Sequence, residues 1–277
     1  MLTDYHLHLR QDTPGTDAET YFSGANVDRY RAVAEERGIA ELGCAEHVYR
    51  FAQALEVWRH PLWRESAVDD IDAYAEFVRE QTDLKLGIEA DFIVGREDHM
   101  ATLLEAREWD FVVGSVHFVG EHAVDHDGFE VYDYRSQRPD ALWRKYFETL
   151  GEAARCGLFD ILAHPDLVKI WGPRNRPVPE GDLRRFYDLA MEGIAESQIA
   201  IEVSTAGLRK PVGELYPSAA FLEMCLDAGC PVALSSDAHV PGDVGRDYDA
   251  ALEMLERLGV GELAVFERRE RRLEAIG

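Results

Sequence analysis

The chain begins with MLTDYHLHLR, residues 1–10, where a short apolar run ends in the pair His6-Leu7-His8. Side chains alternate along a β-strand, so residues two apart point to the same side. If residues 2–6 form a strand, both imidazoles can reach the same ion. This stretch therefore predicts a strand whose carboxyl end carries two potential metal ligands.

Six further short apolar runs follow, most of them separated by segments with helical spacing. The seven predicted strands span residues 2–6, 40–45, 84–90, 111–116, 160–163, 200–203 and 232–234. The predicted helices span residues 27–37, 71–81, 141–154, 183–196, 219–228 and 248–258. Alternating strands and helices predict a parallel sheet covered by helices, in one α/β domain over residues 1–277. Seven strands favour a barrel over an open sheet.

Most of the predicted strands run into histidine, glutamate or aspartate. The residues at these ends are His6, His8, His47, Glu89, His117, His164, Asp237 and His239. In a barrel of parallel strands the carboxyl ends meet at one mouth, where active sites lie. One histidine alone is more often a hydrogen-bonded core or surface residue. The coincidence at six strand ends instead favours a shared metal centre.

Imidazole and carboxylate ligands together are typical of zinc, manganese or iron sites. Eight such residues are too many for one tetrahedral ion. A carboxylate such as Glu89 can bridge two ions, as in two-metal hydrolytic sites. A water between the ions then loses a proton near neutral pH and becomes a nucleophile. The sequence thus predicts a centre with more than one divalent ion of zinc, manganese or iron.

Bulk composition narrows the classes of partner. The chain has 277 residues, 46% of them hydrophobic and 30% charged, as in ordinary globular proteins. Its formal net charge of −24 disfavours binding to nucleic-acid phosphates. No run approaches the roughly 18 uncharged apolar residues of a membrane span, and residues 1–12 do not resemble a signal peptide.

Four cysteines are spread along the chain without a CxxC pair or zinc-finger spacing. They are Cys44, Cys156, Cys225 and Cys230. We expect reduced, mostly buried thiols in a cytoplasmic protein. Three longer segments, residues 51–70, 120–139 and 166–182, are expected to form loops over the site.

The metal-type residues, from His6-x-His8 to Asp237-x-His239, resemble the polymerase-and-histidinol-phosphatase (PHP) family over nearly the whole chain. This resemblance implies a distorted (β/α)7 barrel of PHP type with up to three metals. Two more stretches resemble the histidinol-phosphate phosphatases of the family. They are GSVHF at residues 114–118 and STAGLRKP at residues 204–211, the latter followed by ELYP at residues 214–217.

The resemblance also implies a division of the ligands among the metals. The first ion would take His6, His8, Glu89 and Asp237. The second ion would share Glu89 and take His117 and His164.

The third ion would use His47 and His239. Many family members carry another histidine shortly after the HxH pair, where this chain has Pro14. Asp12 or water would have to replace that ligand. The sequence therefore leaves the occupancy of the third site open.

A phosphomonoester dianion calls for cationic donors, and arginine can bind it with two hydrogen bonds. Arg209 lies just beyond the sixth strand and is the first candidate, which the resemblance also supports. Further candidates for phosphate contact are Lys210, Ser204, Thr205, Arg174 and Lys169.

The resemblance implies hydrolysis of a small phosphate monoester, L-histidinol phosphate, to L-histidinol and phosphate in histidine biosynthesis. A metal-bridging hydroxide would attack phosphorus in line, and Arg209 would neutralise charge on the equatorial oxygens. Asp237 would hold a metal and orient the nucleophile. The acid for the leaving alkoxide stays open between a metal-bound water, His239 and Asp166.

Other functions stay open on the same residues. One is a PHP-fold phosphoesterase for a nucleotide, a sugar phosphate or a phosphotyrosine peptide. Others are a 3′–5′ exonuclease and a metal-binding protein without activity. The native metal, the oligomeric state and the residues that read the histidinol moiety are also open. For that moiety, acidic or aromatic residues within 51–70 and 120–139 are candidates.

Overall fold

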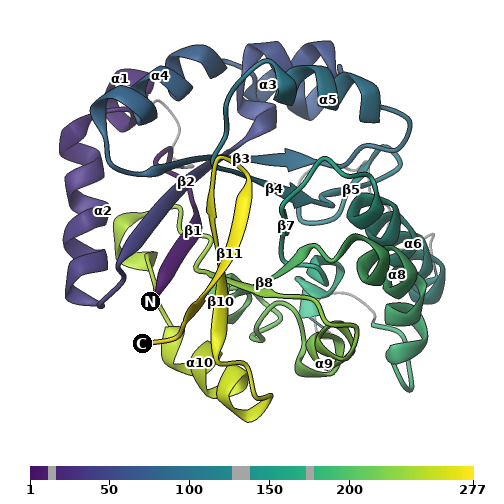
Figure 1. Cartoon of the computed structure of the whole chain (residues 1–277). Coiled ribbons are helices and arrows are strands. Elements are labelled where there is room, and N and C mark those ends of the chain that lie inside the picture. Colours follow the sequence, from purple (N-terminus) through teal and green to yellow (C-terminus); the bar gives the residue numbers. More distant parts are fainter. Residues whose placement is uncertain (12–16, 127–137, 173–177) are drawn as a thin grey trace.

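Seven parallel strands form the central sheet of the computed structural model (Figure 1), which describes residues 1–11, 17–126, 138–172 and 178–277. The strands are β1 (Thr3–Leu7), β2 (Glu41–His47), β3 (Lys85–Asp91), β4 (Phe111–Ser115), β7 (Ile161–Leu162), β8 (Ala200–Ser204) and β9 (Val232–Ser235). Their order in the sheet is the order in the chain. Each of the seven predicted strands corresponds to one of them.

The two edges of this sheet meet. Leu7 at the end of β1 forms a parallel bridge to Ala238, just after β9. The backbone N–H of His8 donates to the Ala238 carbonyl at 2.8 Å. The sheet is therefore a nearly closed barrel, and the predicted PHP-type barrel architecture is confirmed.

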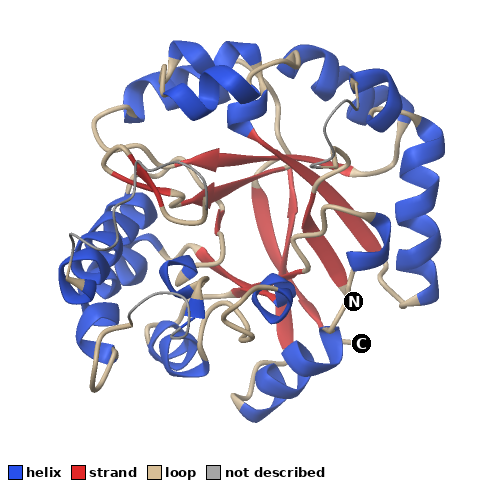
Figure 2. Cartoon of the chain, turned by 180° about the vertical axis from the view of Figure 1, so that it is seen from behind, coloured by secondary structure: helices blue, strands red, loops and turns tan. Residues whose placement is uncertain are grey.

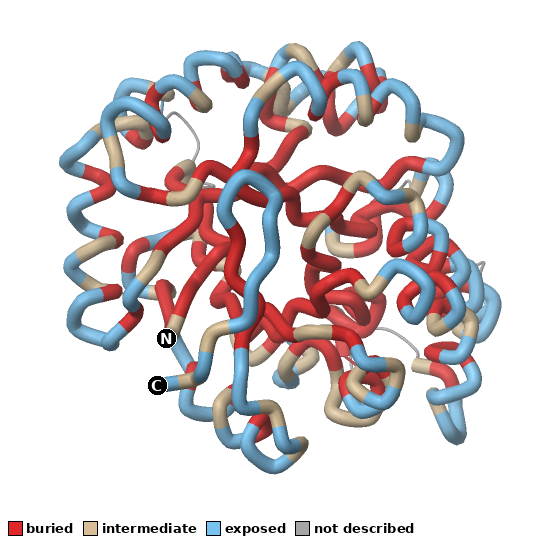
Figure 3. The backbone as a smooth tube through the Cα atoms, viewed as in Figure 1, coloured by how far each residue is buried: buried red, intermediate tan, exposed pale blue. Residues whose placement is uncertain are grey.

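Helices surround this barrel on the outside (Figure 2). Six correspond to the predicted helices: α2 (Gly24–Glu36), α4 (Ile71–Gln81), α6 (Pro139–Arg155), α8 (Arg184–Ser197), α9 (Ala219–Asp227) and α10 (Tyr248–Arg257). The strands are buried beneath them, while the outer faces of the helices are exposed (Figure 3). Asp70 is the N-cap of α4, and its carboxylate accepts from two backbone N–H groups of the first turn.

Several short elements were not predicted. They are α1 (Ala18–Tyr21), α3 (Pro61–Ser66), α5 (Glu97–Glu105), β5 (Phe118–Val119), β6 (His122–Ala123), η1 (Val48–Arg50), η2 (Ala52–Glu56), η3 (Leu167–Lys169), η4 (Thr205–Arg209) and η5 (Pro241–Asp243). The expectation of a loop over residues 51–70 was wrong, because η2 and α3 lie within it. The expected loops over residues 120–139 and 166–182 contain β6 and η3 among their described residues. Except for α5, which is as long as the predicted α9, these elements are too short to show a period in the sequence. Tertiary packing supports them, as for the fully buried Trp63 of α3.

A C-terminal hairpin of β10 (Glu262–Glu267) and β11 (Glu270–Ala275) was also not predicted. It lies across the amino-terminal end of the barrel, in yellow in Figure 1. At its turn, the N–H of Arg268 donates to the side chain of Asp110, which directly precedes β4, at 3.2 Å. Phe266 of β10 packs edge-on against Tyr5 of β1 inside the barrel. The hairpin thus fills the end of the barrel opposite the strand carboxyl ends.

The cysteines and the lengths of the helices bear on two expectations from composition. All four cysteines are free thiols, three of them buried and Cys156 partly exposed. Among the helices of the described residues, none combines the length and apolarity that crossing a bilayer requires.

Candidate metal centre

The eight metal-type residues predicted from sequence lie together at the carboxyl ends of six strands. Six of them are buried, while Asp237 and His239 are partly exposed. Their donor atoms form four overlapping groups of three, each compact enough to hold a metal ion. The barrel therefore brings to one mouth residues that are more than 200 positions apart in the chain.

Glu89 of β3 lies at the middle of the cluster. Its Oε1 is 3.1 Å from Nε2 of His164 and 3.3 Å from Nε2 of His117. Its Oε2 is 3.3 Å from Nε2 of His6 and 3.7 Å from Nε2 of His8. Oε2 also forms an ion pair with Nδ1 of His47. The two oxygens thus face two different sets of imidazoles, which is the arrangement of a carboxylate that bridges two ions.

Asp237 adds a second carboxylate beside the His6 and His8 pair. Its Oδ1 lies 3.3 Å from Nε2 of His8 and 3.8 Å from Nε2 of His6. Both Nε2 atoms, Oδ1 of Asp237 and Oε2 of Glu89 are buried without a hydrogen-bond partner. Leaving such polar atoms unpaired is costly. Four of them facing one another fit a divalent cation.

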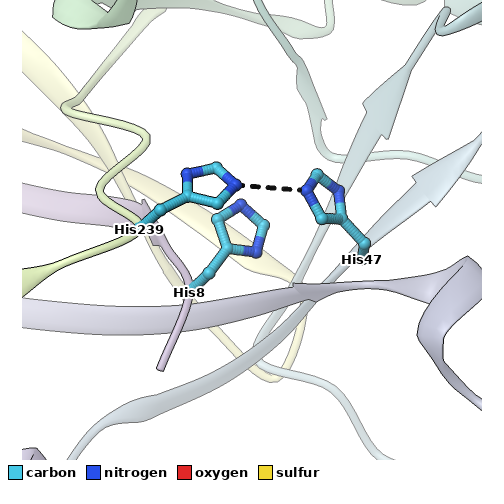
Figure 4. A group of neighbouring side chains, drawn as sticks. All are labelled: His8, His47 and His239. Atoms are coloured by element: carbon cyan, nitrogen blue, oxygen red, sulfur yellow. Dashed lines mark hydrogen bonds between the residues drawn. The ribbon is translucent and has the colours of Figure 1, made fainter. Parts of the chain in front are cut away.

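A third group consists of His8, His47 and His239 (Figure 4). The Nε2 atoms of His47 and His239 are 3.4 Å apart, and the His8 ring stacks on His47 with centroids 4.2 Å apart. Burial lowers the pKa of His47 well below its usual value despite the neighbouring Glu89. The neutral imidazole is the form that binds metals. Pro14 and Asp12 lie outside the described residues.

The surrounding imidazoles keep the carboxylates of Glu89 and Asp237 charged. Burial alone would raise the pKa of Glu89 and of Asp237, but the surrounding imidazoles hold both well below their usual values. Burial alone would lower the pKa of His117, yet Glu89 and Asp91 raise it to about 10. Without a metal, the cluster is thus an array of mutually compensated charges.

Two buried carboxylates that were not predicted from the sequence bind the ring nitrogens of His6 and His117 that point away from the cluster. Glu202 of β8 lies 2.7 Å from Nδ1 of His6, and Asp91 of β3 lies 2.7 Å from Nδ1 of His117. In both cases Nε2 is left facing the cluster, as is common for metal-binding histidines. The alternation of β3 could have indicated Asp91, because it lies two residues after Glu89 and points to the same side.

A cavity of about 660 Å³ opens over the cluster. Five of the metal-type residues line it: His47, His117, His164, Asp237 and His239. Of the described residues, three with cationic side chains also line it, namely Arg10, Arg50 and Lys210. Two carboxylates, of Glu65 and Asp125, belong to the same wall. The cavity therefore offers donors for an anion and acceptors for a cation next to the metal-type residues.

Arg10 and Arg50 were not singled out from sequence, although Arg10 lies two residues after His8. Arg10 forms an ion pair with Asp69, and its backbone N–H donates to Glu46 at 2.9 Å. Arg50 donates to Glu46 and to the carbonyl of Arg10, both at 3.0 Å. Burial would raise the pKa of Glu46, but its partners lower it to about 2. The charged Glu46 thus fixes both arginines at the cavity wall.

The side chains of the adjacent residues Arg209 and Lys210 have different surroundings. Nη2 of Arg209 donates to the backbone carbonyl of Ser236 at 2.6 Å and lies 3.4 Å from that of Asp237, and its Nε lies 3.6 Å from Asp243. Arg209 thus holds the loop that carries Asp237, whereas the exposed Lys210 lines the cavity. That Arg209 contacts the phosphate stays a prediction.

Lys169 is bound to its own loop and to the segment that follows η4. Its ammonium lies 2.9 Å from Asp166 and 3.2 Å from Glu214, and donates to the Leu215 carbonyl at 2.8 Å. Lys169 and Asp166 are buried and are not among the residues of the cavity wall. Arg174 lies outside the described residues.

Ser204 and Thr205 are buried at the junction of β8 and η4. The Ser204 hydroxyl accepts from the N–H of Ala206 at 3.3 Å and so caps η4. The Thr205 hydroxyl is buried without a hydrogen-bond partner. A role of either hydroxyl in phosphate contact stays a prediction.

Comparison with known proteins decides the family. A family model described as "PHP domain" matches residues 6–206, which is more than half of the chain. The chain belongs to the PHP domain family. The match includes six of the eight metal-type residues, while Asp237 and His239 lie beyond its end.

Curated relatives of this PHP chain have similar names. A probable histidinol-phosphatase from Deinococcus radiodurans is 32% identical, over 97% of this chain and 98% of the relative. A histidinol-phosphatase from Bacillus subtilis is 25% identical, over 68% of this chain and 75% of the relative.

A solved structure with the same fold is the histidinol phosphate phosphatase of Lactococcus lactis, complexed with zinc, L-histidinol and phosphate. The TM-score is 0.72, with 19% sequence identity and coverage of 98% of each chain. At that identity the likeness establishes the fold.

Proposed function

We propose that this PHP protein is a metal-dependent phosphatase that hydrolyses L-histidinol phosphate to L-histidinol and phosphate. The observation that carries the proposal is Glu89, whose two oxygens face two different sets of imidazoles beneath a cavity lined by cations. The names of the curated relatives support the substrate.

Two divalent ions would be held as the family resemblance implies. His6, His8, Glu89 and Asp237 would hold one, and Glu89, His117 and His164 the other. The compact donor groups of the structure also join Glu89 to His6 and His164, and to His47 and His117. When bound, such ions lower the pKa of a water and neutralise phosphate charge. The donor set suits zinc, manganese or iron.

His47 and His239 would hold a third ion, and His8 lies close enough to contribute. His8 would then be shared between two positions. Because the two positions would compete for His8, the third position would be only partly filled with metal.

The cavity wall supplies the contacts to the phosphate. Lys210 and Arg10 would bind its oxygens with charge-assisted hydrogen bonds. Arg209 would act by holding the loop of Asp237, in addition to any phosphate contact of its own. Among the candidate acids for the leaving alkoxide, His239 lines the cavity whereas Asp166 is buried away from it, and His239 would act as the acid only when it holds no third ion.

The histidinol moiety carries an ammonium group, which calls for carboxylates. Glu65 and Asp125 line the cavity and would bind it. Both fall within the segments 51–70 and 120–139, from which the sequence analysis drew its candidates.

A substrate panel tests this proposal. The chain is loaded with zinc, manganese or iron, and its metal content is measured. The specificity constant kcat/KM is then compared between histidinol phosphate, p-nitrophenyl phosphate, a nucleoside monophosphate, a sugar phosphate and a phosphotyrosine peptide. We expect histidinol phosphate to be preferred by about a hundredfold or more.

The variant Glu89→Gln should lose activity toward every ester, with its fold checked by circular dichroism. Similar turnover of all esters would reject the assigned substrate. Activity retained in Glu89→Gln would reject the metal centre.

A further inference from the structure

We infer that Glu202 is a positioning residue shared by both halves of the metal centre, because its single carboxylate holds the ring of His6 and the backbone of His164. The two histidines belong to different proposed ions. The inference rests on the metal centre and not on the identity of the substrate.

Three donors converge on Glu202, which is 1% exposed. Its Oε1 accepts from Nδ1 of His6 at 2.7 Å and from the hydroxyl of Ser235 at 2.6 Å. Its Oε2 accepts from the backbone N–H of His164 at 2.6 Å. Both oxygens are used as acceptors, and only an ionised carboxylate offers acceptors at both positions.

The bond to His6 decides which ring nitrogen faces the metal centre. With the proton on Nδ1 directed to Glu202, Nε2 of His6 presents a lone pair toward Glu89 and Asp237, at 3.3 Å and 3.8 Å. The opposite tautomer would point an N–H at these carboxylates and could not bind a metal.

The bond to His164 acts on the backbone. His164 has φ of 24°, a left-handed conformation that costs a non-glycine residue roughly 1–3 kcal/mol. The N–H of His164 is held by Glu202 in that conformation, which places Nε2 of His164 3.1 Å from Oε1 of Glu89. One side chain thus positions a ligand on each side of the Glu89 bridge.

A glutamine side chain at position 202 could not accept both hydrogen bonds in either orientation of its amide group. If its NH2 replaced Oε2, it would oppose the N–H of His164. If its NH2 replaced Oε1, it would oppose the Nδ1 proton of His6 and favour the tautomer that cannot bind. Asp91 makes a matched control, because within the described part of the chain its carboxylate bonds to His117 alone, through one oxygen. An asparagine there can keep its oxygen toward His117.

The test measures metal affinity in Glu202→Gln, Asp91→Asn and the unchanged protein. Each is stripped with a chelator and titrated with Zn²⁺ against a fluorescent competitor. We expect Zn²⁺ binding to Glu202→Gln to weaken about 10–100-fold, and binding to Asp91→Asn to weaken less than about tenfold. A Glu202→Gln protein that binds as tightly as the unchanged protein, or no more weakly than Asp91→Asn, would overturn the inference.

A measurement on the unchanged protein covers the case in which Glu202→Gln does not fold. In the zinc-loaded protein with ¹⁵N-labelled histidine, NMR should detect a proton on Nδ1 of His6 that exchanges slowly with water. A rapidly exchanging Nδ1 proton would overturn the role of Glu202. Failure of the unchanged protein to bind Zn²⁺ would instead reject the metal centre itself, so the two failures are distinguishable.

Discussion

His117 lies between two carboxylates of the same strand. Its Nδ1 is 2.7 Å from Oδ1 of Asp91, and its Nε2 is 3.3 Å from Oε1 of Glu89. Glu89 and Asp91 are two residues apart on β3 and therefore point to the same side. The strand period thus supplies both the bridging carboxylate and the group that orients its neighbour.

Replacing Asp91 by alanine should weaken metal binding more than replacing it by asparagine, because alanine leaves Nδ1 of His117 without an acceptor. We expect the Zn²⁺ affinity of Asp91→Ala to fall about 10–100-fold, measured by chelator competition. Thermal unfolding followed by circular dichroism controls for a general loss of structure. Equal affinities of the two variants would show that the ring of His117 is oriented by other contacts.

Lys210 and Arg209 should respond differently to substitution by methionine. In Lys210→Met the loss of a charged hydrogen bond of about 1.5–3 kcal/mol should lower kcat/KM about 10–100-fold, mainly through KM, at unchanged metal content. In Arg209→Met the loop of Asp237 loses its anchor, so bound metal should decrease. Metal analysis and steady-state kinetics on both variants separate the two effects. Normal metal content in Arg209→Met would contradict its role in holding the loop.

The carboxylates of Glu65 and Asp125 should matter more for histidinol phosphate than for an ester without an ammonium group. We expect Glu65→Gln and Asp125→Asn each to lower kcat/KM for histidinol phosphate about tenfold or more. The loss for p-nitrophenyl phosphate, measured on the same preparations, should be smaller. Equal losses for both esters would place these carboxylates outside the recognition of the organic moiety.

His60 should make the stability of the α3 region dependent on pH. Its Nδ1 accepts from the N–H of Leu62 at 3.3 Å and so caps α3, which requires an unprotonated nitrogen. Burial lowers the pKa of His60 below its ordinary value of 6.5. The unfolded chain therefore binds the proton first, and the stability from His60 is lost as the pH falls below 6.5 through the folded pKa.

The variant His60→Asn keeps a capping acceptor that does not titrate near neutral pH. Between about pH 7 and about pH 5 its Tm should fall less than that of the unchanged protein, both measured without metal. This difference isolates His60 from the other histidines, which titrate in both proteins. An identical pH dependence would contradict the capping role.

Phe266 should contribute to stability without affecting the metal centre. It is 1% exposed and packs against Tyr5 at the amino-terminal end of the barrel. Phe266→Ala should therefore lower the free energy of unfolding by about 3–5 kcal/mol, as determined in urea. Zn²⁺ affinity should be unchanged, because the hairpin lies at the other end of the strands. A loss below about 1 kcal/mol would show that the hairpin does not stabilise the barrel.

The sequence by itself determined the strands, most of the main helices and the metal-type residues. Buried parallel strands are short apolar runs, and a helix such as α4 repeats its apolar residues at a period that is visible locally. The carboxyl end of each strand can also be located from the local sequence. Once the strands close into a barrel, these ends meet, and Glu89 therefore approaches His117 and His164.

Only the tertiary structure decided which polar side chains support that cluster. Glu202 reaches His6 across 196 positions of the chain, and no local period signals such a pair. Likewise, the adjacent residues Arg209 and Lys210 look equivalent in sequence, but one turns toward the Asp237 loop and the other toward the cavity. The direction of a side chain at the end of a strand depends on which neighbouring strands offer it a partner. The closure of the barrel determines which strands are neighbours, so it determines these side-chain directions, and the local sequence does not.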